Sequence, residues 1–174
     1  MRKIPTIFFR DESKNGHPVI NKIKPECQWV IDGEGVATRK FDGMNVKIEN
    51  GKFYKRQKPK EGEYSEASYI QVEPISTDNK WLMEAFENSD KSDGIYEAVG
   101  PKIQGNAENM SHHKLIKIVP MDKRFYLNNV PRIFDSIAFY FQRYNIEGIV
   151  FHHSDGRMAK IKCRDFGLKR KNAI

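Results

Sequence analysis

The sequence has few cysteines and no long apolar run. Among its 174 residues only Cys27 and Cys163 are cysteines, which is too few for a disulfide framework and lacks the paired spacing of a zinc site. Residues 1–10 lack the apolar core of a signal peptide, and no stretch approaches the ~20 apolar residues that a membrane-spanning helix requires. We therefore expect a soluble, intracellular protein of the cytoplasm, or of the host cytoplasm if its source is a phage, with no membrane partner.

Common nucleotide-binding motifs are also missing. The sequence contains no G-x-x-x-x-G-K-[ST] run, which excludes a P-loop, and no G-x-G-x-x-G follows a predicted strand. A nucleotide would have to be bound by another scheme. Two histidine pairs, His112-His113 and His152-His153, suggest a metal site. Adjacent residues on a strand point to opposite faces, however, so we do not expect either pair to bind a metal as a unit.

Positive charge is in excess and is concentrated in the last part of the sequence. The chain has 30 Lys and Arg residues against 23 Asp and Glu residues, which gives a net charge of +7. Residues 157–174 contain seven Lys or Arg residues and one Asp, so their net charge is +6. A solvated tail that aids solubility would explain this pattern, and so would a site for a polyanion. Under the second hypothesis the phosphate-binding residues are Arg164, Lys169, Arg170 and Lys171.

Short apolar runs bounded by turn residues predict strands throughout the chain. The predicted strands are 6–9, 28–31, 35–38, 44–48, 52–55, 95–99, 115–119, 147–152 and 157–161. Asn50-Gly51 and Ser154-Asp155-Gly156 predict tight hairpin turns, so the sheets should be antiparallel. Helical periods occur over 79–88 and 131–145, and the second predicts a buried face of Ile133, Phe134, Ile137, Phe141 and Tyr144. The sequence thus predicts an α+β fold of antiparallel sheets with flanking helices.

The chain has the length of one domain. A chain of this size buries about two-thirds of its unfolded surface and needs no disulfide or metal to fold. Residues 57–79 and 100–113 are rich in Gly, Pro, Asn and charged residues and predict long surface loops. We find no internal repeat or domain linker, and we therefore expect a single domain over residues 1–174 with a basic C-terminal tail.

One motif suggests covalent chemistry by a lysine. A Lys-x-Asp-Gly string, here residues 40–43, is often an ordinary turn. A lysine attacks phosphorus only as the neutral amine, and at a reference pKa of ~10.4 almost none is neutral at pH 7. Lys160 and Lys162 alternate along one predicted strand and so share a face. Placed beside Lys40, they would lower its pKa and stabilise charge on a phosphate under attack.

Three carboxylates lie where such a lysine would need them. Asp42, Glu97 and Glu147 each stand at the edge of a predicted strand, which can aim them at one point. Carboxylate oxygens bind divalent cations such as Mg²⁺ or Mn²⁺, and they accept hydrogen bonds from ribose hydroxyls. Each carboxylate alone would be an ordinary surface residue. Their occurrence together with the lysines predicts a site for a nucleotide and a divalent metal.

These ordered motifs resemble those of the covalent nucleotidyltransferases, the superfamily of polynucleotide ligases and messenger-RNA capping enzymes. More narrowly, the chain is similar to the ATP-dependent RNA ligases that include the vertebrate 5′-to-3′ RNA ligase and its phage and bacterial relatives. The strings that carry this similarity are IPTIFFRD, GEGVATRKFDG, YEAVGPKIQGN, IEGIVFHHSDGRMAKIK and CRDFGLK. The resemblance implies the nucleotidyltransferase fold, in which the nucleotide lies in a groove between antiparallel sheets, without the OB-fold domain of larger ligases.

The resemblance also implies roles for the motif residues. With ATP as the cofactor, Lys40 would become adenylylated, Asp42 would act at the sealing step, and Lys160 and Lys162 would engage the α-phosphate. The nucleotide-binding residues would be Thr38, Arg39, Lys40, Gly43, Asn45, Arg56, Glu97, Lys160 and Lys162. The metal ligands would be Glu147, Glu97 and Asp42, and His113 or Leu115 would replace the ring that stacks on the base in many ligases. The partners would be RNA ends, which the basic tail would bind.

Three functions fit these residues. The first is an ATP-dependent RNA ligase that passes AMP from Lys40 to an RNA 5′-phosphate and seals this end to a 3′-hydroxyl. A DNA ligase or a GTP-dependent guanylyltransferase of the capping type would share the first step, but many of these enzymes carry Arg where this chain has Asn45. The third is a nucleic-acid-binding module with a decayed site, against which the intact charged motif positions argue. We take the RNA ligase as the working hypothesis.

Overall fold

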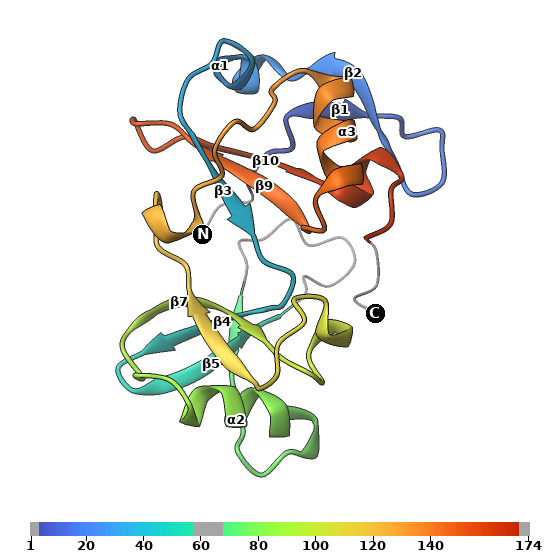
Figure 1. The fold of residues 1–174 in the computed structure, drawn as a ribbon. Coiled ribbons are helices and arrows are strands. Elements are labelled where there is room, and N and C mark those ends of the chain that lie inside the picture. The colour runs from blue at the N-terminus through green and yellow to red at the C-terminus, as the bar shows by residue number, and fades with distance from the viewer. Residues whose placement is uncertain (1–3, 58–67, 171–174) are drawn as a thin grey trace. The chain divides into compact units, whose positions relative to one another are not determined.

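The computed structural model describes residues 4–57 and 68–170 (Figure 1). It consists of antiparallel sheets and a few helices, which confirms the predicted combination. The chain divides into two compact units, which we call the terminal unit (Ile4–Phe41 with Pro120–Asn172) and the central unit (Asp42–Val119). The single domain expected over residues 1–174 stays a prediction. Within the part of the chain that the structure describes, no helix has both the length and the apolar character needed to cross a membrane.

The terminal unit contains two small sheets (Figure 1). Its strands are β1 (Phe8–Arg10), β2 (Val19–Ile23), β3 (Val36–Lys40), β9 (Gly148–His152) and β10 (Met158–Lys162). Its helices are α1 (Gln28–Ile31) and α3 (Phe134–Arg143), with 3-10 turns at Pro25–Cys27, Lys123–Phe125 and Cys163–Phe166. β1 pairs with β2, and β9 lies between β3 and β10 in an antiparallel sheet of three strands.

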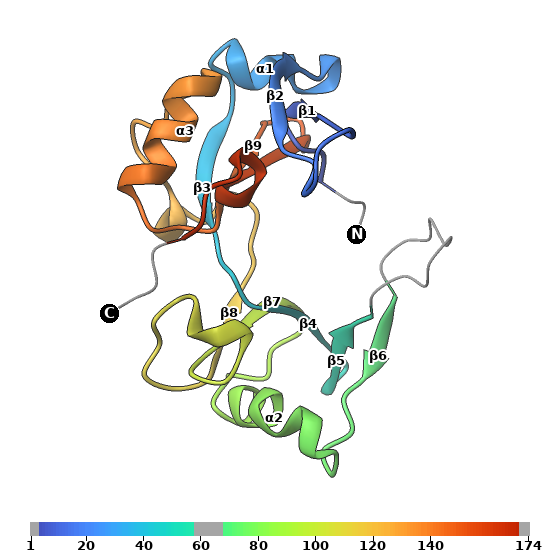
Figure 2. The same cartoon turned by 90° about the vertical axis from the view of Figure 1, so that its right-hand side faces the viewer.

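The central unit is a five-stranded antiparallel sheet with one helix against it (Figure 2). Its strands follow the order β6 (Tyr69–Gln71), β5 (Lys52–Arg56), β4 (Met44–Glu49), β7 (Gly94–Val99) and β8 (Lys114–Lys117). The helix is α2 (Lys80–Glu87), and 3-10 turns lie at Thr77–Asn79 and Gln104–Asn106. Leu82 and Phe86 of α2 pack in one buried cluster with Val46 and Ile48 of β4. The core of this unit is therefore the layer between α2 and the sheet.

Both predicted hairpins are confirmed. Asn50 and Gly51 join β4 to β5 with φ angles of 51° and 71°. Both residues therefore adopt the left-handed conformation that a two-residue turn between twisted strands requires. β9 and β10 also form an antiparallel pair, and Gly156 in the turn between them has a φ of 91°.

One strand prediction is wrong, and two strands were not predicted. Residues 28–31 form the helix α1 rather than a strand. A short apolar run alone does not separate the two structures; here a 3-10 turn that starts with Pro25 precedes the run, and the indole of Trp29 donates to the Glu26 carbonyl. The sequence also did not predict β2, or β6 within the expected loop 57–79. The rest of that loop includes residues 58–67, which lie outside the described residues.

Helix α3 is shorter than its apolar pattern predicts. Ile133 and Tyr144 have extended backbone conformations and flank the helix rather than continue it. Their exposed fractions are 67% and 52%, whereas Ile137 within the helix is 0% exposed. The predicted buried face is therefore correct for Ile137 and Phe141 and wrong for Ile133 and Tyr144. Ile137 and Phe141 pack against Ile149, Phe151 and Ile161 of the three-stranded sheet.

This difference gives a stability prediction. We expect Ile137→Ala to reduce the free energy of unfolding by about 2–5 kcal/mol, because it leaves a cavity in the core of the terminal unit. Ile133→Ala is the matched control and should change stability by less than about 0.5 kcal/mol, because the side chain is exposed. Thermal unfolding followed by circular dichroism measures both. Equal losses in the two variants would contradict the observed limits of α3.

Candidate active site

The three-stranded sheet has one apolar face and one polar face. Its register pairs Lys40 and Lys162 with Gly148, and Thr38 and Lys160 with Val150. Residues in register share a face of a sheet. The apolar residues of the sheet that belong to the buried core cluster lie at the intervening positions; they are Ala37, Ile149, Phe151, Ala159 and Ile161. The structure thus brings four predicted site residues to one face: Thr38, Lys40, Lys160 and Lys162.

Gly148 allows the strands around Lys40 and Lys162 to pack closely. A Cβ added at this position would lie 2.5 Å from the carbonyl oxygen of Ile161 and 3.2 Å from Cα of Lys162. Backbone atoms cannot give way cheaply, so a larger residue at 148 would push β10 away from β9. The motif therefore needs a glycine at position 148, because the register places Lys40 and Lys162 on either side of it.

Glu147 binds the two lysines at once. Its Oε2 lies 2.6 Å from Nζ of Lys40, and its Oε1 lies 2.6 Å from Nζ of Lys162. The exposed side-chain fractions are 22% for Lys40, 11% for Glu147 and 14% for Lys162, so water screens these ion pairs only partly. Burial alone raises the pKa of Glu147, but the charges of Lys40 and Lys162 and their hydrogen bonds outweigh it and leave this pKa below its ordinary value.

One carboxylate between two ammonium groups gives these three side chains a net charge of +1. Lys160 adds a further cation on the same face, two residues from Lys162. The cluster of Lys40, Glu147, Lys160 and Lys162, which we call the lysine cluster, is therefore suited to a polyanion such as a triphosphate. A bound anion would compete with Glu147 for Lys40 and Lys162.

A buried aspartate that the sequence analysis missed holds the end of β10. Asp165 is 2% exposed, and it accepts hydrogen bonds from the backbone N–H of Lys162 at 2.9 Å and from the Arg10 guanidinium at 2.6 Å. These contacts join the IPTIFFRD and CRDFGLK segments. Asp165 and Arg10 therefore position the backbone that carries Lys162. Arg10 stands at the end of β1, 155 positions from Asp165, so no local pattern in the sequence indicates this pairing.

Thr38 and Arg39 have partners within the terminal unit. The Thr38 hydroxyl donates to the Val150 carbonyl at 3.3 Å and lies 2.9 Å from Nε2 of His152. Burial lowers the pKa of His152, which favours the neutral imidazole. The Arg39 guanidinium lies 5.2 Å from the ring centre of Phe41. The predicted contacts of Thr38 and Arg39 with a nucleotide stay predictions.

In the central unit, two carboxylates hold the backbone that follows the lysine. Glu108 accepts from the N–H of Asp42 at 3.0 Å, and Glu97 accepts from the N–H of Gly43 at 3.2 Å. Gly43 has no room for a side chain, because an added Cβ would collide with the Ala98 carbonyl and with Glu97. The Asp-Gly of the motif is thus fixed against β7 and the loop that contains Glu108. Glu108 is 8% exposed and was not predicted as a site residue.

The same sheet brings together three predicted nucleotide-binding residues. Asn45 of β4 is directly opposite Glu97 of β7, and Arg56 of β5 is opposite Tyr69 of β6. The Tyr69 hydroxyl donates to Oδ1 of Asn45 at 2.7 Å and so connects the two pairs. Tyr69 was not predicted, since it lies in the stretch expected to be a loop.

The prediction for His113 as a base-stacking ring is wrong. His113 is 4% exposed, and its ring is stacked on Trp81 with the ring centres 5.0 Å apart. Its Nε2 accepts from the N–H of Lys102, and its Nδ1 lies 2.8 Å from Glu84. Both ring nitrogens and one ring face are therefore used inside the central unit. Leu115 packs against the apolar cluster of the same unit.

The predicted metal ligands do not form one group within either unit. Glu147 belongs to the terminal unit, whereas Asp42 and Glu97 belong to the central unit. Over residues 4–57 and 68–170, the structure contains no cluster of three or more His, Cys, Asp or Glu side chains that could hold a metal ion. The metal site stays a prediction.

The predicted RNA-binding residues are only partly brought together. Lys169 and Arg170 line one pocket of the terminal unit, and Arg164 does not. Arg164 is exposed on the 3-10 turn after β10. Lys171 lies outside the described residues.

Comparison with known proteins gives no family for this chain. Neither a model of a known protein family nor a curated protein sequence matches it. Evidence for the function of this chain therefore comes from the motifs and from the geometry of their side chains.

The lysine cluster gives a prediction for stability against pH. Because the pKa of Glu147 is lowered on folding, its contribution is complete above the ordinary value of 4.5 and is lost as the pH falls through the lower folded value. We expect Glu147→Gln to reduce the free energy of unfolding by about 1–3 kcal/mol at pH 7. This difference in stability from the wild type should shrink below pH 4.5. Thermal unfolding over a pH series measures this.

An exposed ion pair provides the control for that series. Glu49 pairs with Lys47 at 2.7 Å but has a side chain that is 52% exposed. Glu49→Gln should therefore change stability by less than about 0.5 kcal/mol at either pH. A stability difference for Glu147→Gln that is the same at acid and neutral pH would contradict the ion pairs of Glu147.

Proposed function

We propose that this protein is an ATP-dependent RNA ligase of the covalent nucleotidyltransferase superfamily, with the corresponding fold. The observation that carries the proposal is the lysine cluster, in which Lys40 shares Glu147 with Lys162 on one sheet face. The order of the motifs along the chain supports the same function. The cluster supplies a nucleophile and an electropositive face for a phosphate, which are the two needs of nucleotidyl transfer.

The first step would join Lys40 to AMP. Lys40 leaves its ion pair with Glu147 and gives a proton to solvent water, and its neutral Nζ attacks the α-phosphorus of ATP. A nitrogen–phosphorus bond forms while the bond from this phosphorus to the bridging oxygen breaks, and pyrophosphate leaves with the electron pair. Lys160 and Lys162 stabilise the charge that builds on the α-phosphate oxygens.

Two further transfers would complete the ligation. An oxygen of the RNA 5′-phosphate attacks the phosphorus bound to Lys40, and the nitrogen–phosphorus bond breaks to return the lysine. The 3′-hydroxyl oxygen of the other RNA end then loses its proton and attacks the 5′-terminal phosphorus, and AMP leaves. In this proposal Asp42 acts at the sealing step.

ATP and a divalent metal, Mg²⁺ or Mn²⁺, are the cofactors that this function needs. Glu147 in the terminal unit, and Glu97 and Asp42 in the central unit, are each proposed as a metal ligand, because hard divalent cations prefer carboxylate oxygens. The metal would offset part of the charge of the triphosphate. Arg56 and Glu97 would bind the ribose hydroxyls, and Asn45 would support them through its position opposite Glu97.

An RNA-joining assay tests this function. We expect the wild-type protein to join 5′-phosphorylated, 3′-hydroxyl RNA ends when ATP and Mg²⁺ or Mn²⁺ are present, and Lys40→Ala to abolish joining because the covalent intermediate cannot form. Lys47→Ala is the matched control, since Lys47 also lies on a strand and pairs with a carboxylate. This control should join RNA at the wild-type rate.

The same assay separates the other hypotheses. Joining of DNA ends but not of RNA ends would identify a DNA ligase, and labelling by GTP instead of ATP would identify a guanylyltransferase. RNA binding without labelling by either nucleotide would support the third hypothesis, a nucleic-acid-binding module with a decayed site. Each of these results would contradict the RNA ligase.

The individual residues of the lysine cluster give a kinetic prediction. Lys160→Ala and Lys162→Ala should each slow adenylylation by on the order of 10²–10³-fold, since each removes a preorganised cation from the α-phosphate. Glu147→Ala should also impair nucleotide transfer, because it removes a proposed metal ligand. Rapid-quench measurement with labelled ATP gives the rate of transfer for each variant. Near-normal rates combined with earlier melting would instead assign these residues a purely structural role.

A further inference from the structure

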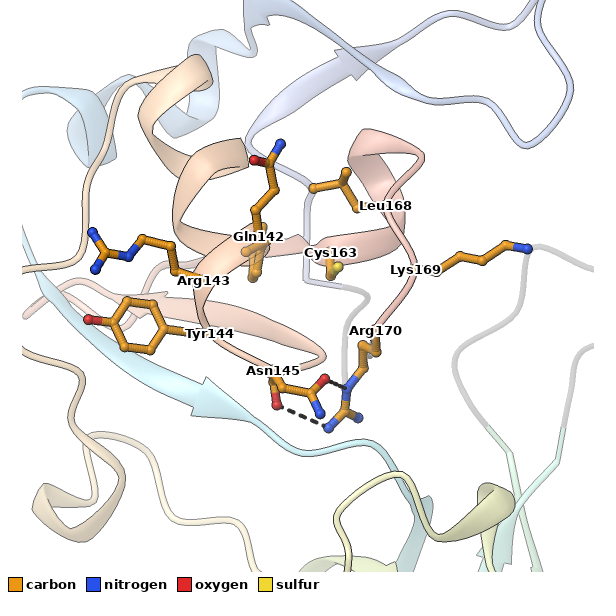
Figure 3. Close-up of a pocket in the computed structure, with 9 residues that line it drawn as sticks. Gln142, Arg143, Tyr144, Asn145, Cys163, Leu168, Lys169 and Arg170 are labelled. Atoms are coloured by element: carbon orange, nitrogen blue, oxygen red, sulfur yellow. Dashed lines mark hydrogen bonds between the residues drawn. The ribbon is translucent and has the colours of Figure 1, made fainter. Parts of the chain in front are cut away.

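A small pocket lies in the terminal unit where α3 ends and the segment after β10 returns to it (Figure 3). Its volume is about 160 Å³. Phe141, Cys163 and Leu168 contribute apolar or weakly polar atoms, and the remaining lining residues are polar, charged or aromatic. These are Gln142, Arg143, Tyr144, Asn145, Lys169 and Arg170.

The pocket is cationic. Three of its lining residues are Lys or Arg and none is Asp or Glu, whereas the whole chain has 30 cations and 23 carboxylates. Arg170 lies against Asn145, with a guanidinium nitrogen 3.3 Å from the backbone carbonyl of that residue. Figure 3 shows the side chains of Arg143 and Lys169 extending to opposite sides of the pocket. Cations spread in this way suit an extended polyanion better than one compact anion.

An aromatic ring accompanies the cations. Tyr144 lines the pocket and is 52% exposed, and its ring centre lies 4.4 Å from that of Tyr140 with the two rings tilted by 32°. Arg143 and Tyr144 extend to the same side in Figure 3. A basic surface with an exposed ring is the combination by which proteins bind single-stranded nucleic acid, because every base has a face that can stack.

The backbone connects the pocket to the lysine cluster. The N–H of Cys163, which lines the pocket, donates to the carbonyl of Glu147 at 2.9 Å. Cys163 directly follows Lys162, and Asn145 lies two residues before Glu147. The pocket and the lysine cluster are therefore built on the same stretch of backbone, from opposite sides of the sheet.

We propose that this pocket binds the backbone of a single-stranded RNA segment, with Arg143, Lys169 and Arg170 contacting its phosphates and Tyr144 stacking on a base. The proposal rests on the proposed function only where it takes the strand to be the RNA that is joined. Binding itself needs neither ATP nor catalysis. Arg143 and Tyr144 have no place in the ligase motifs, and the geometry alone points to them.

Fluorescence anisotropy with a labelled single-stranded oligoribonucleotide tests the pocket. We expect the double variant Arg143→Ala with Lys169→Ala to weaken RNA binding by about 10-fold or more, because it removes charged hydrogen bonds to phosphates. Between about 50 and 200 mM salt, the slope of log affinity against log salt should flatten by about 0.7 for each phosphate that is no longer neutralised. Tyr144→Ala should weaken binding at least about 5-fold, and Tyr144→Phe should retain it.

Exposed lysines of the same unit control for net charge. Lys22→Ala with Lys123→Ala removes the same charge outside the pocket, and it should leave affinity close to the wild-type value. Unchanged affinity and salt slope in the Arg143 and Lys169 double variant would overturn the proposal. Equal losses of affinity in both double variants would also overturn it, since they would show a nonspecific effect of net charge.

Adenylylation of Lys40 is measured in parallel to keep this proposal apart from the proposed function. RNA binding that depends on the pocket, without labelling of Lys40 in the wild type, would support the pocket and contradict the ligase. Labelling of Lys40, together with RNA binding that the pocket variants do not change, would support the ligase and contradict the pocket. Loss of ATP labelling but not of RNA binding in the pocket variant would overturn the RNA assignment and identify the polyphosphate of the nucleotide as the occupant.

Discussion

The register of β3, β9 and β10 is the constraint on which the terminal unit depends. It places Lys40 and Lys162 on either side of Gly148, with their side chains on the face opposite the core. A glycine is required between them because backbone atoms of β10 occupy the space of a side chain. A one-residue slip of either strand would turn its lysines into the core. The apolar packing of α3 against this sheet therefore also fixes the proposed chemistry.

Glu147 links the electrostatics of this sheet to its stability. A partly buried pair of lysines without a carboxylate would repel each other, and Glu147 compensates one of the two charges. The net charge of +1 on Lys40, Glu147 and Lys162 favours an anion. The same carboxylate thus stabilises the protein and holds Lys40 in an ion pair that the proposed triphosphate would have to displace. Asp165 and Arg10 fix the backbone on the other side of Lys162.

Local rules made much of the fold predictable. Asn50-Gly51 specified a hairpin, and alternation placed Lys160 and Lys162 on one face. The limits of α3 were not predictable from periodicity, because Ile133 and Tyr144 continue the apolar pattern where the backbone is already extended. The ion pair of Lys40 and Glu147 joins residues 107 positions apart. Only strand pairing determines such a contact, and the pocket around Arg143 likewise depends on how the chain after β10 returns to α3.

The most direct test of the central claim is to locate a nucleotide adduct on the protein. After incubation with ATP and Mg²⁺ or Mn²⁺, the intact mass should increase by one AMP, and tandem mass spectrometry should place the adduct on Lys40. The bond should be an acid-labile phosphoramidate. An adduct on a different residue, or wild-type-level labelling of Lys40→Ala, would contradict the claim that Lys40 is the nucleophile.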